Sequence, residues 1–385
     1  MEPTIDANAA DTATPPSGLT LLDSFLQRDG VSDAVSDALR TIREAIVDDA
    51  LGDRPFLTVL LRTQGRRLEP IKDALLCLAA QTDQDFEVVI IDHDSTESGA
   101  QGVRRVVESQ PASFRTRIRI VEVVGGTRST PLNAGIKVAA GRYIAVFDDD
   151  DLLFADWVER FHEASDTAGT RLLRAQTATQ NARPEVWTGG FEGQRSLSWP
   201  HSAYAPTFDQ IQHLRVNHSP FMSWAFPRGL FSQLGLTFDE ALDVCEDWDM
   251  ILRASLLVGV EDLPALTSIY RRWEGAATSY TVHSTDIWRA SEKRVIDRLD
   301  DSAIILPQGS VSEIRELLAV YEHKDDDRDA MAQYRLMLTS RSWRWSIPLR
   351  ILRNRFVRVR GTILHNWNRL HASRSGNRDG TVQNR

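Results

Sequence analysis

The sequence predicts an α/β protein with a mostly parallel central sheet, flanking helices, and helical extensions at both ends. Four continuous apolar segments are expected as strands: FLTVLL at 56–61, FEVVII at 86–91, IRIVEVV at 118–124 and RYIAVF at 142–147. Because strands that are apolar throughout are covered on both faces, their alternation with helices indicates a parallel sheet. Ligands of such sheets bind beyond the carboxyl ends of the strands, and Asp92 and Asp148 each follow a strand there.

The remaining elements are predicted from apolar residues at helical spacing. Helices are expected at 69–80, 102–109, 132–140, 247–257, 284–300, 310–322 and 326–339. An amphipathic helix, or a pair broken near Gly30, is expected within 19–50. After about residue 165 the pattern loosens, and residues 170–225 combine many turn residues with several aromatic side chains.

The composition is that of an ordinary globular protein. The chain has 385 residues, of which 42% are hydrophobic and 26% charged, with a net charge of −9. No segment approaches the roughly 18 apolar residues that a membrane-spanning helix needs. The N-terminus is acidic and lacks the apolar core of a secretory signal. With only two cysteines, Cys77 and Cys245, no disulfide framework is indicated, and a cytoplasmic location is expected.

The predicted domain organisation follows these composition shifts. Residues 1–18 are expected to be disordered, 19–52 to form a helical extension, and 53–290 to form the main domain. This domain divides into halves at 53–165 and 166–290, followed by a helical segment at 291–340 and a basic amphipathic tail at 341–385.

The first cluster of candidate site residues is the acidic run Asp148, Asp149, Asp150 and Asp151. Adjacent carboxylates repel one another unless a cation neutralises them or water solvates them. A divalent ion held by one or two carboxylates and by phosphate oxygens is a common solution in nucleotide sites. The alternative is a solvated acidic turn before the next helix, and the run alone favours neither.

Three further clusters are weaker when each is taken alone. Asp92-His93-Asp94-Ser95 follows the second strand, Glu246-Asp247-Trp248-Asp249 begins a helix, and Tyr270-Arg271-Arg272-Trp273 lies late in the domain. A carboxylate can contact a base or ribose or take a proton from an attacking hydroxyl, and arginine can hold a diphosphate. Each also has a structural interpretation as a turn, an acidic first helical turn or a solvated basic strand end.

Taken together and in order, these segments resemble the family 2 glycosyltransferases. The resemblance covers about residues 55–280 and rests on TVLLRTQGR, LAAQTDQDFEVVIIDHDS, PLNAGIKVAAGRYIAVFDDDD, FDEALDVCEDWDMILRA and IYRRWEGAATS. It implies the GT-A fold, which is Rossmann-like. It also implies an inverting, metal-dependent transfer of a sugar from a nucleotide-diphosphate sugar to an acceptor hydroxyl, with Mg or Mn as the cation.

The resemblance assigns roles position by position. Asp247 matches the catalytic base, with Glu246 beside it, and Asp148 with Asp150 matches the metal-binding pair. The expected nucleotide-sugar contacts are Arg62, Thr63, Asp92, Asp94, Arg128, Asn133, Asp148, Asp149 and Arg271. The chain departs from the family at His93, where a second aspartate is common, and at Leu132, where an arginine is common; Arg128 could substitute for the latter.

The basic tail suggests the setting. Residues 330–378 contain 11 arginines, no lysine and no acidic residue. SRSWRWSIPLRILRNRFVRVRG is similar to a C-terminal segment of bacterial glycosyltransferases that build surface polysaccharides. Arginines amid tryptophan and aliphatic side chains favour contact with an anionic membrane, each basic residue contributing on the order of 1 kcal/mol. The alternative is a basic helix packed on the acidic body, and nucleic acid is not expected because no recognition module accompanies the tail.

The expected partners are therefore a nucleotide-diphosphate sugar donor and a glycan or lipid-linked acceptor. Two rival functions stay open. One is a catalytically silent relative that binds nucleotide sugar or acts as a scaffold. The other is a different parallel-sheet enzyme, such as a nucleotidyltransferase or phosphohydrolase. A nucleotidyltransferase would be expected to carry a glycine-rich phosphate loop after its first strand, and RTQGRR has one glycine.

Overall fold

The structure is a computed structural model that describes residues 19–20, 22, 33–47, 54–188, 191–275 and 279–319. The chain divides into two compact units, 1–310 and 311–385. The first unit carries the sheet and the candidate site. Of the second unit only residues 311–319 are described, in a helix that begins at residue 310, so the predicted helix at 326–339 and the basic tail lie outside the described residues.

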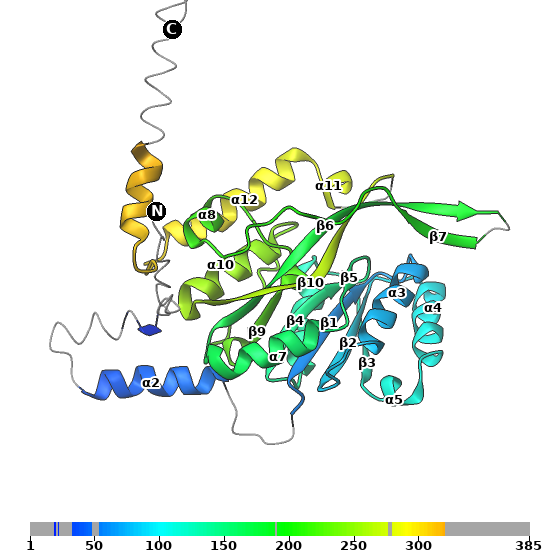
Figure 1. The fold of residues 1–385 in the computed structure, drawn as a ribbon, viewed down its shortest axis with the longest axis horizontal. Helices are drawn as coiled ribbons and strands as arrows, with labels where there is room; N and C mark the ends of the chain where they lie inside the picture. Colours follow the sequence, from blue (N-terminus) through cyan, green and yellow to red (C-terminus); the bar gives the residue numbers. More distant parts are fainter. Residues whose placement is uncertain are drawn as a thin grey trace, which may run out of the picture. The chain divides into compact units, whose positions relative to one another are not determined.

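One sheet with strand order β3-β2-β1-β4-β9-β6-β10-β5 forms the centre of the first unit (Figure 1). Its first four strands are β1 (Leu57–Thr63), β2 (Phe86–His93), β3 (Ile118–Val123) and β4 (Tyr143–Asp148). All three pairings among these four strands are parallel. Each strand overlaps a segment predicted from its continuous apolar run, which confirms the α/β fold class and the parallel part of the sheet.

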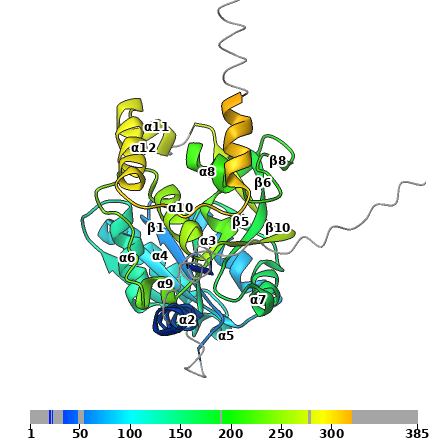
Figure 2. The ribbon, with the colours of Figure 1, turned by 90° about the vertical axis from the view of Figure 1, so that its left-hand side faces the viewer.

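Side chains alternate between the two faces of these strands and supply two separate cores. Val59 and Leu61 on β1 pack into a cluster with α3 (Leu68–Ala79), α4 (Glu97–Glu108) and α7 (Trp157–Ala168). Leu60, between them, points to the opposite cluster with α6 (Ser129–Val138), α9 (Gly229–Ser232) and α10 (Glu246–Val258). The helices therefore lie on both faces of the sheet, as the view along it shows (Figure 2). This two-sided burial is the reason that the strands are apolar throughout.

The second half of the sheet is mixed rather than parallel. The 16-residue strand β6 (Leu172–Trp187) pairs in parallel with β10 (Val260–Trp273) and antiparallel with β9 (Trp224–Pro227). Shorter antiparallel partners are β5 (Leu152–Leu153), β7 (Phe191–Ser196) and β8 (His201–Ser202). The loosened pattern expected at 170–225 thus conceals a long strand. Some of its polar side chains are hydrogen-bonded across the sheet, for example Thr177 to Ser268 at 2.6 Å between hydroxyl oxygens.

Helices account for most of the rest of the described chain. They include α2 (Asp33–Val47), α5 (Ala112–Arg115), α8 (Gln210–Arg215), α11 (Ser279–Val282) and α12 (Thr285–Asp300), with a 3-10 turn at Phe221–Ser223. Helix α2 lies inside the predicted N-terminal helical segment, and its Ile46 is fully buried. Helix α4 begins five residues before the predicted start at Gly102, because Thr96 caps it by accepting a hydrogen bond from the Gly99 amide.

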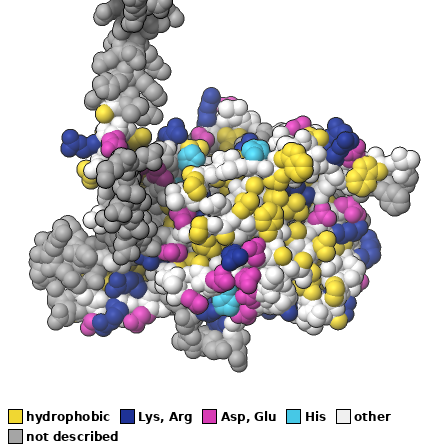
Figure 3. All heavy atoms as spheres, in the orientation of Figure 1, with side chains coloured by type: hydrophobic (Ala, Val, Ile, Leu, Met, Phe, Trp, Pro, Cys, Tyr) yellow, Lys and Arg dark blue, Asp and Glu magenta, His cyan; other side chains and the backbone are white. Residues whose placement is uncertain are grey.

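The surface combines charges of both signs with scattered hydrophobic side chains (Figure 3). The hairpin of β6 and β7 extends beyond the body of the unit and carries the exposed Val186 and Trp187 (Figure 1). Two aromatic residues of the 166–290 half differ in burial: Trp199 is almost fully exposed, whereas Trp224 is buried in the core. Among the described helices, none is long and apolar enough to cross a membrane.

Candidate functional site

The carboxyl edge of the parallel strands brings the sequence-predicted residues together. The register pairs Thr63 at the end of β1 with Asp92 on β2, and Arg62 with Asp148 on β4. The turn after β1 approaches the start of α4 closely, and Gly65 there has φ +62°. A Cβ atom on Gly65 would lie 2.5 Å from the Ser95 hydroxyl, so glycine is needed for this approach. The sheet edge is therefore a compact polar site.

Arg62 is the centre of this site. Its Nη2 donates to Asp148 Oδ1 at 3.0 Å, and its Nη1 donates to Glu246 Oε1 at 3.0 Å. Its Nε also donates to Asp148, and Nη1 donates to the carbonyl oxygen of Arg128. The Arg62 side chain is 11% exposed, and the two carboxylates hold its pKa above the usual arginine value despite burial. These donors are directed to the protein, and the expected contact of Arg62 with the nucleotide stays a prediction.

Glu246 is held by a second guanidinium. Arg128 Nε donates to the same Oε1 atom at 2.8 Å. Burial by itself raises the pKa of Glu246, but the charges of Arg128 and Arg62 lower it to about 2. Glu246 is thus ionised and fully paired at neutral pH, which suits a structural anchor better than a proton acceptor.

The pKa of Asp247, the next residue, is shifted in the opposite direction. Burial and the adjacent charge of Glu246 raise the pKa of its carboxyl to about 6. Its Oδ1 accepts from the Trp248 amide at 2.7 Å and its Oδ2 from the Asn217 side-chain amide at 2.9 Å. A carboxylate with a pKa near neutrality can both exist ionised and accept a proton, which are the properties of a general base.

The middle of the acidic run is held by the turn after β1. The Thr63 hydroxyl donates to Asp149 Oδ2 at 2.6 Å, and Arg67 Nη2 donates to Asp150 Oδ2 at 2.8 Å. Burial and the neighbouring charge of Asp150 raise the pKa of Asp149 to about 7. Arg67 is 37% exposed and its guanidinium carbon lies 5.7 Å from the centre of the Trp273 ring. Arg67 could not be predicted as a site residue, because nothing in a lone arginine beyond a turn indicates its partner.

The end of the run is tied to β10. Asp151 Oδ1 accepts from the Arg271 amide at 2.8 Å, and Arg271 Nε donates to the carbonyl oxygen of Asp150 at 2.6 Å. Burial, with the charge of Asp150 second, raises the pKa of Asp151 well above its usual value. Arg271 therefore contacts the backbone of the acidic run, and its expected contact with a diphosphate stays a prediction.

The second-strand cluster forms its own turn. Asp92 accepts from the Ser95 hydroxyl, and Asp94, with φ 53°, accepts from the Gly125 amide at 2.7 Å. His93 Nε2 lies 3.1 Å from the Gly125 carbonyl oxygen. The residue that departs from the family pattern therefore joins β2 to the loop after β3. Asp92 lies at the sheet edge as predicted, and its contact with a base or ribose stays a prediction.

Asn133 is engaged away from the acidic run. Its amide nitrogen donates to the Phe238 carbonyl oxygen at 3.0 Å and to Glu240 Oε1 at 2.9 Å. Its amide oxygen accepts from the Phe238 amide at 2.9 Å. These bonds join α6 to the loop before α10. Its predicted contact with the sugar or diphosphate stays untested.

The carboxylates suit a hard divalent cation in part. Carboxylate oxygens are the ligands that Mg and Mn prefer, and nucleotide sites supply one or two of them with phosphate oxygens completing the shell. Asp148 and Asp150 offer such oxygens, although each is paired with an arginine. Within the described ranges, no group of three or more His, Cys, Asp or Glu side chains is arranged to hold a metal ion. A cation here would therefore depend on ligands from the substrate.

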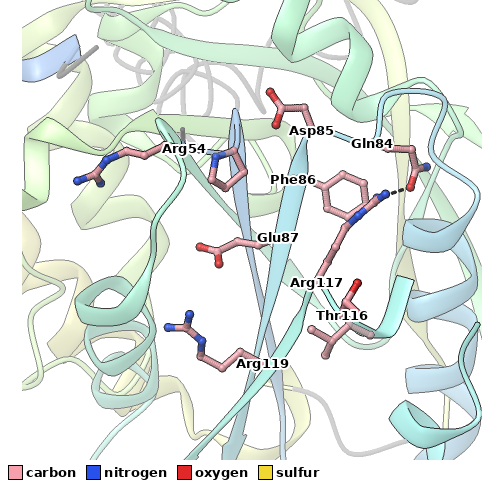
Figure 4. A pocket seen from close by; sticks show the side chains of 10 residues that line it. Arg54, Gln84, Asp85, Phe86, Glu87, Thr116, Arg117 and Arg119 are labelled. Carbon is pink, nitrogen blue, oxygen red and sulfur yellow. Dashed lines mark hydrogen bonds between the residues drawn. The ribbon is translucent and has the colours of Figure 1, made fainter. Parts of the chain in front are cut away.

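A separate hollow of about 580 Å³ lies at the opposite, amino edge of the strands (Figure 4). Its lining includes Arg54, Glu87, Arg117 and Arg119. In Figure 4 the guanidinium of Arg117 points toward the Gln84 side chain, to which it donates, and away from those of Arg54 and Arg119. The arginines do not converge on one point, and the acidic run and the Glu246-Asp247 pair lie at the other edge of the sheet. The candidate site is therefore at the carboxyl edge.

Comparison with known proteins agrees with this geometry. Residues 59–227 match the model of glycosyl transferase family 2. The chain is 24% identical over 184 residues to the uncharacterized glycosyltransferase EpsJ of Bacillus subtilis, covering 47% of this chain and 51% of that protein. It is 29% identical over 242 residues to the succinoglycan biosynthesis protein ExoO of Rhizobium meliloti, covering 59% and 63%. The chain thus spans between half and two thirds of the length of these curated relatives.

Solved structures are more distant. S. aureus TarS 1-349 in complex with UDP-GlcNAc is 18% identical with a TM-score of 0.46, covering 60% of this chain and 63% of that one. The mannosyltransferase PcManGT from Pyrobaculum calidifontis, in complex with GDP-Man and Mn2+, is 18% identical with a TM-score of 0.44, covering 66% and 67%.

Proposed function

Because residues 59–227 match the model of glycosyl transferase family 2, we propose that this chain transfers a sugar from a nucleotide-diphosphate sugar to an acceptor hydroxyl. The observation that carries the proposal is the junction at Arg62, which binds Asp148 on one side and Glu246 on the other, both at 3.0 Å. The acidic run at the end of β4 and the acidic pair at the start of α10 therefore belong to one site. A transferase needs this arrangement, with donor-binding and proton-accepting groups side by side.

The proposed transfer inverts the anomeric carbon in one step. Asp247 accepts the proton of the acceptor hydroxyl while the hydroxyl oxygen forms a bond to the anomeric carbon. The bond from the carbon to the diphosphate oxygen breaks, and its electron pair leaves with the nucleotide. A divalent cation, Mg or Mn, would be held by Asp148 and Asp150 and would stabilise the charge that develops on the diphosphate. Glu246, paired with two arginines, keeps the helix start and its Asp247 in place.

We also propose the setting of the reaction. The relatives EpsJ and ExoO are described as a glycosyltransferase and a succinoglycan biosynthesis protein, which supports a role in bacterial surface polysaccharide synthesis. The acceptor would be a glycan or a lipid-linked glycan. The protein would act in the cytoplasm, at the inner face of the membrane, with the arginine-rich 341–385 tail contacting anionic lipid.

The proposal is tested by offering UDP-, GDP- and dTDP-sugars with and without Mn and measuring thermal shift, nucleotide binding and sugar transfer. We expect one nucleotide class to stabilise the protein, and to do so more strongly with Mn. Asp150→Ala should remove the Mn-dependent part of the binding, and Asp247→Asn should bind the donor but lose transfer. Binding by the wild-type protein without any transfer to a range of acceptors would favour the catalytically silent alternative. Transfer of a nucleotidyl group would favour the nucleotidyltransferase.

A further inference from the structure

The segment Asn217–Ser219 lies between the proposed base and the middle of the sheet. The Asn217 side-chain amide donates to Asp247 Oδ2 at 2.9 Å. Its amide oxygen accepts from the Ser219 backbone amide at 3.2 Å. This second bond determines which end of the side chain is nitrogen, because only the oxygen can accept from a backbone N–H. The nitrogen is then directed at the carboxylate.

The segment is anchored by a buried arginine. Arg174 on β6 is 3% exposed and donates through Nε to the Ser219 hydroxyl at 3.1 Å. Its other nitrogens donate to Asp262 at 2.8 Å and to the carbonyl oxygen of Ala205 at 2.7 Å. The Ser219 hydroxyl also contacts that of Ser223 at 2.9 Å. Asn217 is therefore presented to Asp247 by a rigid, fully bonded support, which is the usual means of orienting a reactive side chain.

We propose that Asn217 is a positioning residue that orients Asp247 and stabilises its ionised form for accepting the proton of the acceptor hydroxyl. The inference rests on the proposed function and names a residue for that same site. Asp247 has two oxygens, each with one hydrogen bond from the protein. The bond from Asn217 comes from a neutral donor, so it favours the charged carboxylate without neutralising it, as an arginine would.

The surroundings of Asp247 explain why such a donor is needed. Glu246, next to it on α10, disfavours a second negative charge, and so does burial. Arg128 favours the ionised form but donates its Nε to Glu246. Of the nearby titratable groups, Cys245, before the helix, interacts with Asp247, and His218 follows Asn217 in the chain. The hydrogen bond from Asn217 lowers the pKa of Asp247, against the effect of burial and Glu246.

The experiment compares Asn217→Ala with two matched variants across pH. We expect the acid limb of kcat/KM to move to higher pH by about one unit in Asn217→Ala, since a hydrogen bond to a charged group is lost. The KM for the donor should change little. Asn217→Ser keeps a side chain that can form the same turn and donate a hydrogen bond, so it should restore part of the shift. Ser219→Ala loses the Arg174 contact but keeps the backbone amide that Asn217 uses, so it should leave the pH profile in place.

A second readout does not require turnover. The carboxyl resonance of Asp247, identified by its loss in Asp247→Asn, is titrated by NMR with 13C-labelled aspartate in wild type and Asn217→Ala. A higher midpoint in Asn217→Ala supports the proposal, and an equal midpoint overturns it. Equal losses of rate in Asn217→Ala and Ser219→Ala, with neither pH profile moved, would also overturn it, because that pattern belongs to a loop anchor. Absence of transfer by the wild type would contradict the proposed function instead, and the titration would still decide the role of Asn217.

Discussion

Arg67 and Asp150 form an ion pair of 2.8 Å between residues that are 83 positions apart in the chain. The Arg67 guanidinium also lies 3.6 Å from Asp149, so one arginine pairs with two carboxylates of the acidic run. The pair joins the turn after β1 to the end of β4 and places a positive charge where the proposed cation would bind. A divalent ion and Arg67 should therefore compete for the same negative charge.

We expect Arg67→Ala to raise the affinity of the protein for Mn, measured without nucleotide, by roughly 3- to 10-fold, since removing a nearby cation favours binding of another. Titration followed by electron paramagnetic resonance would measure free Mn directly. Arg66→Ala is the matched control, because Arg66 is the neighbouring residue, carries the same charge and has an exposed side chain. Equal Mn affinity in the wild type and Arg67→Ala would contradict competition at Asp150.

Arg62→Ala should destabilise the protein strongly. It would leave Glu246, which is 5% exposed, with only one of its two cations and would leave Asp148 unpaired. Removing one partner of a buried ion pair costs about 3 kcal/mol or more. Denaturation by urea at pH 7 would measure the loss. Arg40→Ala breaks an ion pair with Asp37 in which both side chains are more than half exposed. It should lower the free energy of unfolding by under about 1 kcal/mol. A small loss of stability in Arg62→Ala would mean that water solvates the Asp148 and Glu246 carboxylates in place of the arginine.

Asp247→Asn should make the protein more stable at neutral pH while abolishing transfer. The folded pKa of about 6 lies above the ordinary value of 3.8, so the folded state binds the proton more tightly than the unfolded chain does. The favourable contribution is complete below pH 3.8 and is lost as pH rises through 6. At pH 8 the substitution should therefore raise the free energy of unfolding by on the order of 2 kcal/mol. At pH 4 the difference should be small, which thermal unfolding at both pH values would show.

Deleting residues after Arg341 should reduce association with liposomes that contain anionic lipid and leave donor binding unchanged. The deleted segment is rich in arginine, and each basic residue near an anionic surface contributes about 1 kcal/mol. Flotation with neutral liposomes is the control, since binding there should be weak for both forms. If both forms float equally with anionic liposomes, the membrane role of the tail is wrong.

Strand ends were the part of the site that the sequence could predict. Asp92 and Asp148 follow continuous apolar segments, and parallel strands bring their carboxyl ends to one edge. Arg67 and Asn217 could not be found in this way, because their partners lie 83 and 30 positions away and the contacts depend on how the loops fold. Asn133 and Glu246 resemble functional positions of the family, yet their side chains are engaged with neighbouring protein groups.

The long strand β6 shows why the second half of the domain was harder to predict. Its first ten residues are mostly buried although Arg174, Thr177 and Gln180 are polar, because cross-strand and loop partners accept or donate hydrogen bonds to them. Periodicity alone assigns such residues to a solvated segment. The beginning of α4 was missed for a related reason, since its first turn is defined by the Thr96 cap rather than by apolar spacing.

The ion pairs of Arg62 make substitutions at Arg62, Asp148 and Glu246 depend on one another. Asp148 and Glu246 are 98 residues apart in the sequence, yet each is neutralised by the same side chain. Loss of Arg62 would leave Asp148 without this ion pair and Glu246 with Arg128 alone, whereas loss of either acid would leave an arginine that still has a carboxylate partner. The acids can therefore change before the arginine can, and double substitutions of Asp148 and Glu246 should be non-additive in stability. Among related sequences, we therefore expect Asp148 or Glu246 to be substituted while Arg62 is kept more often than the reverse.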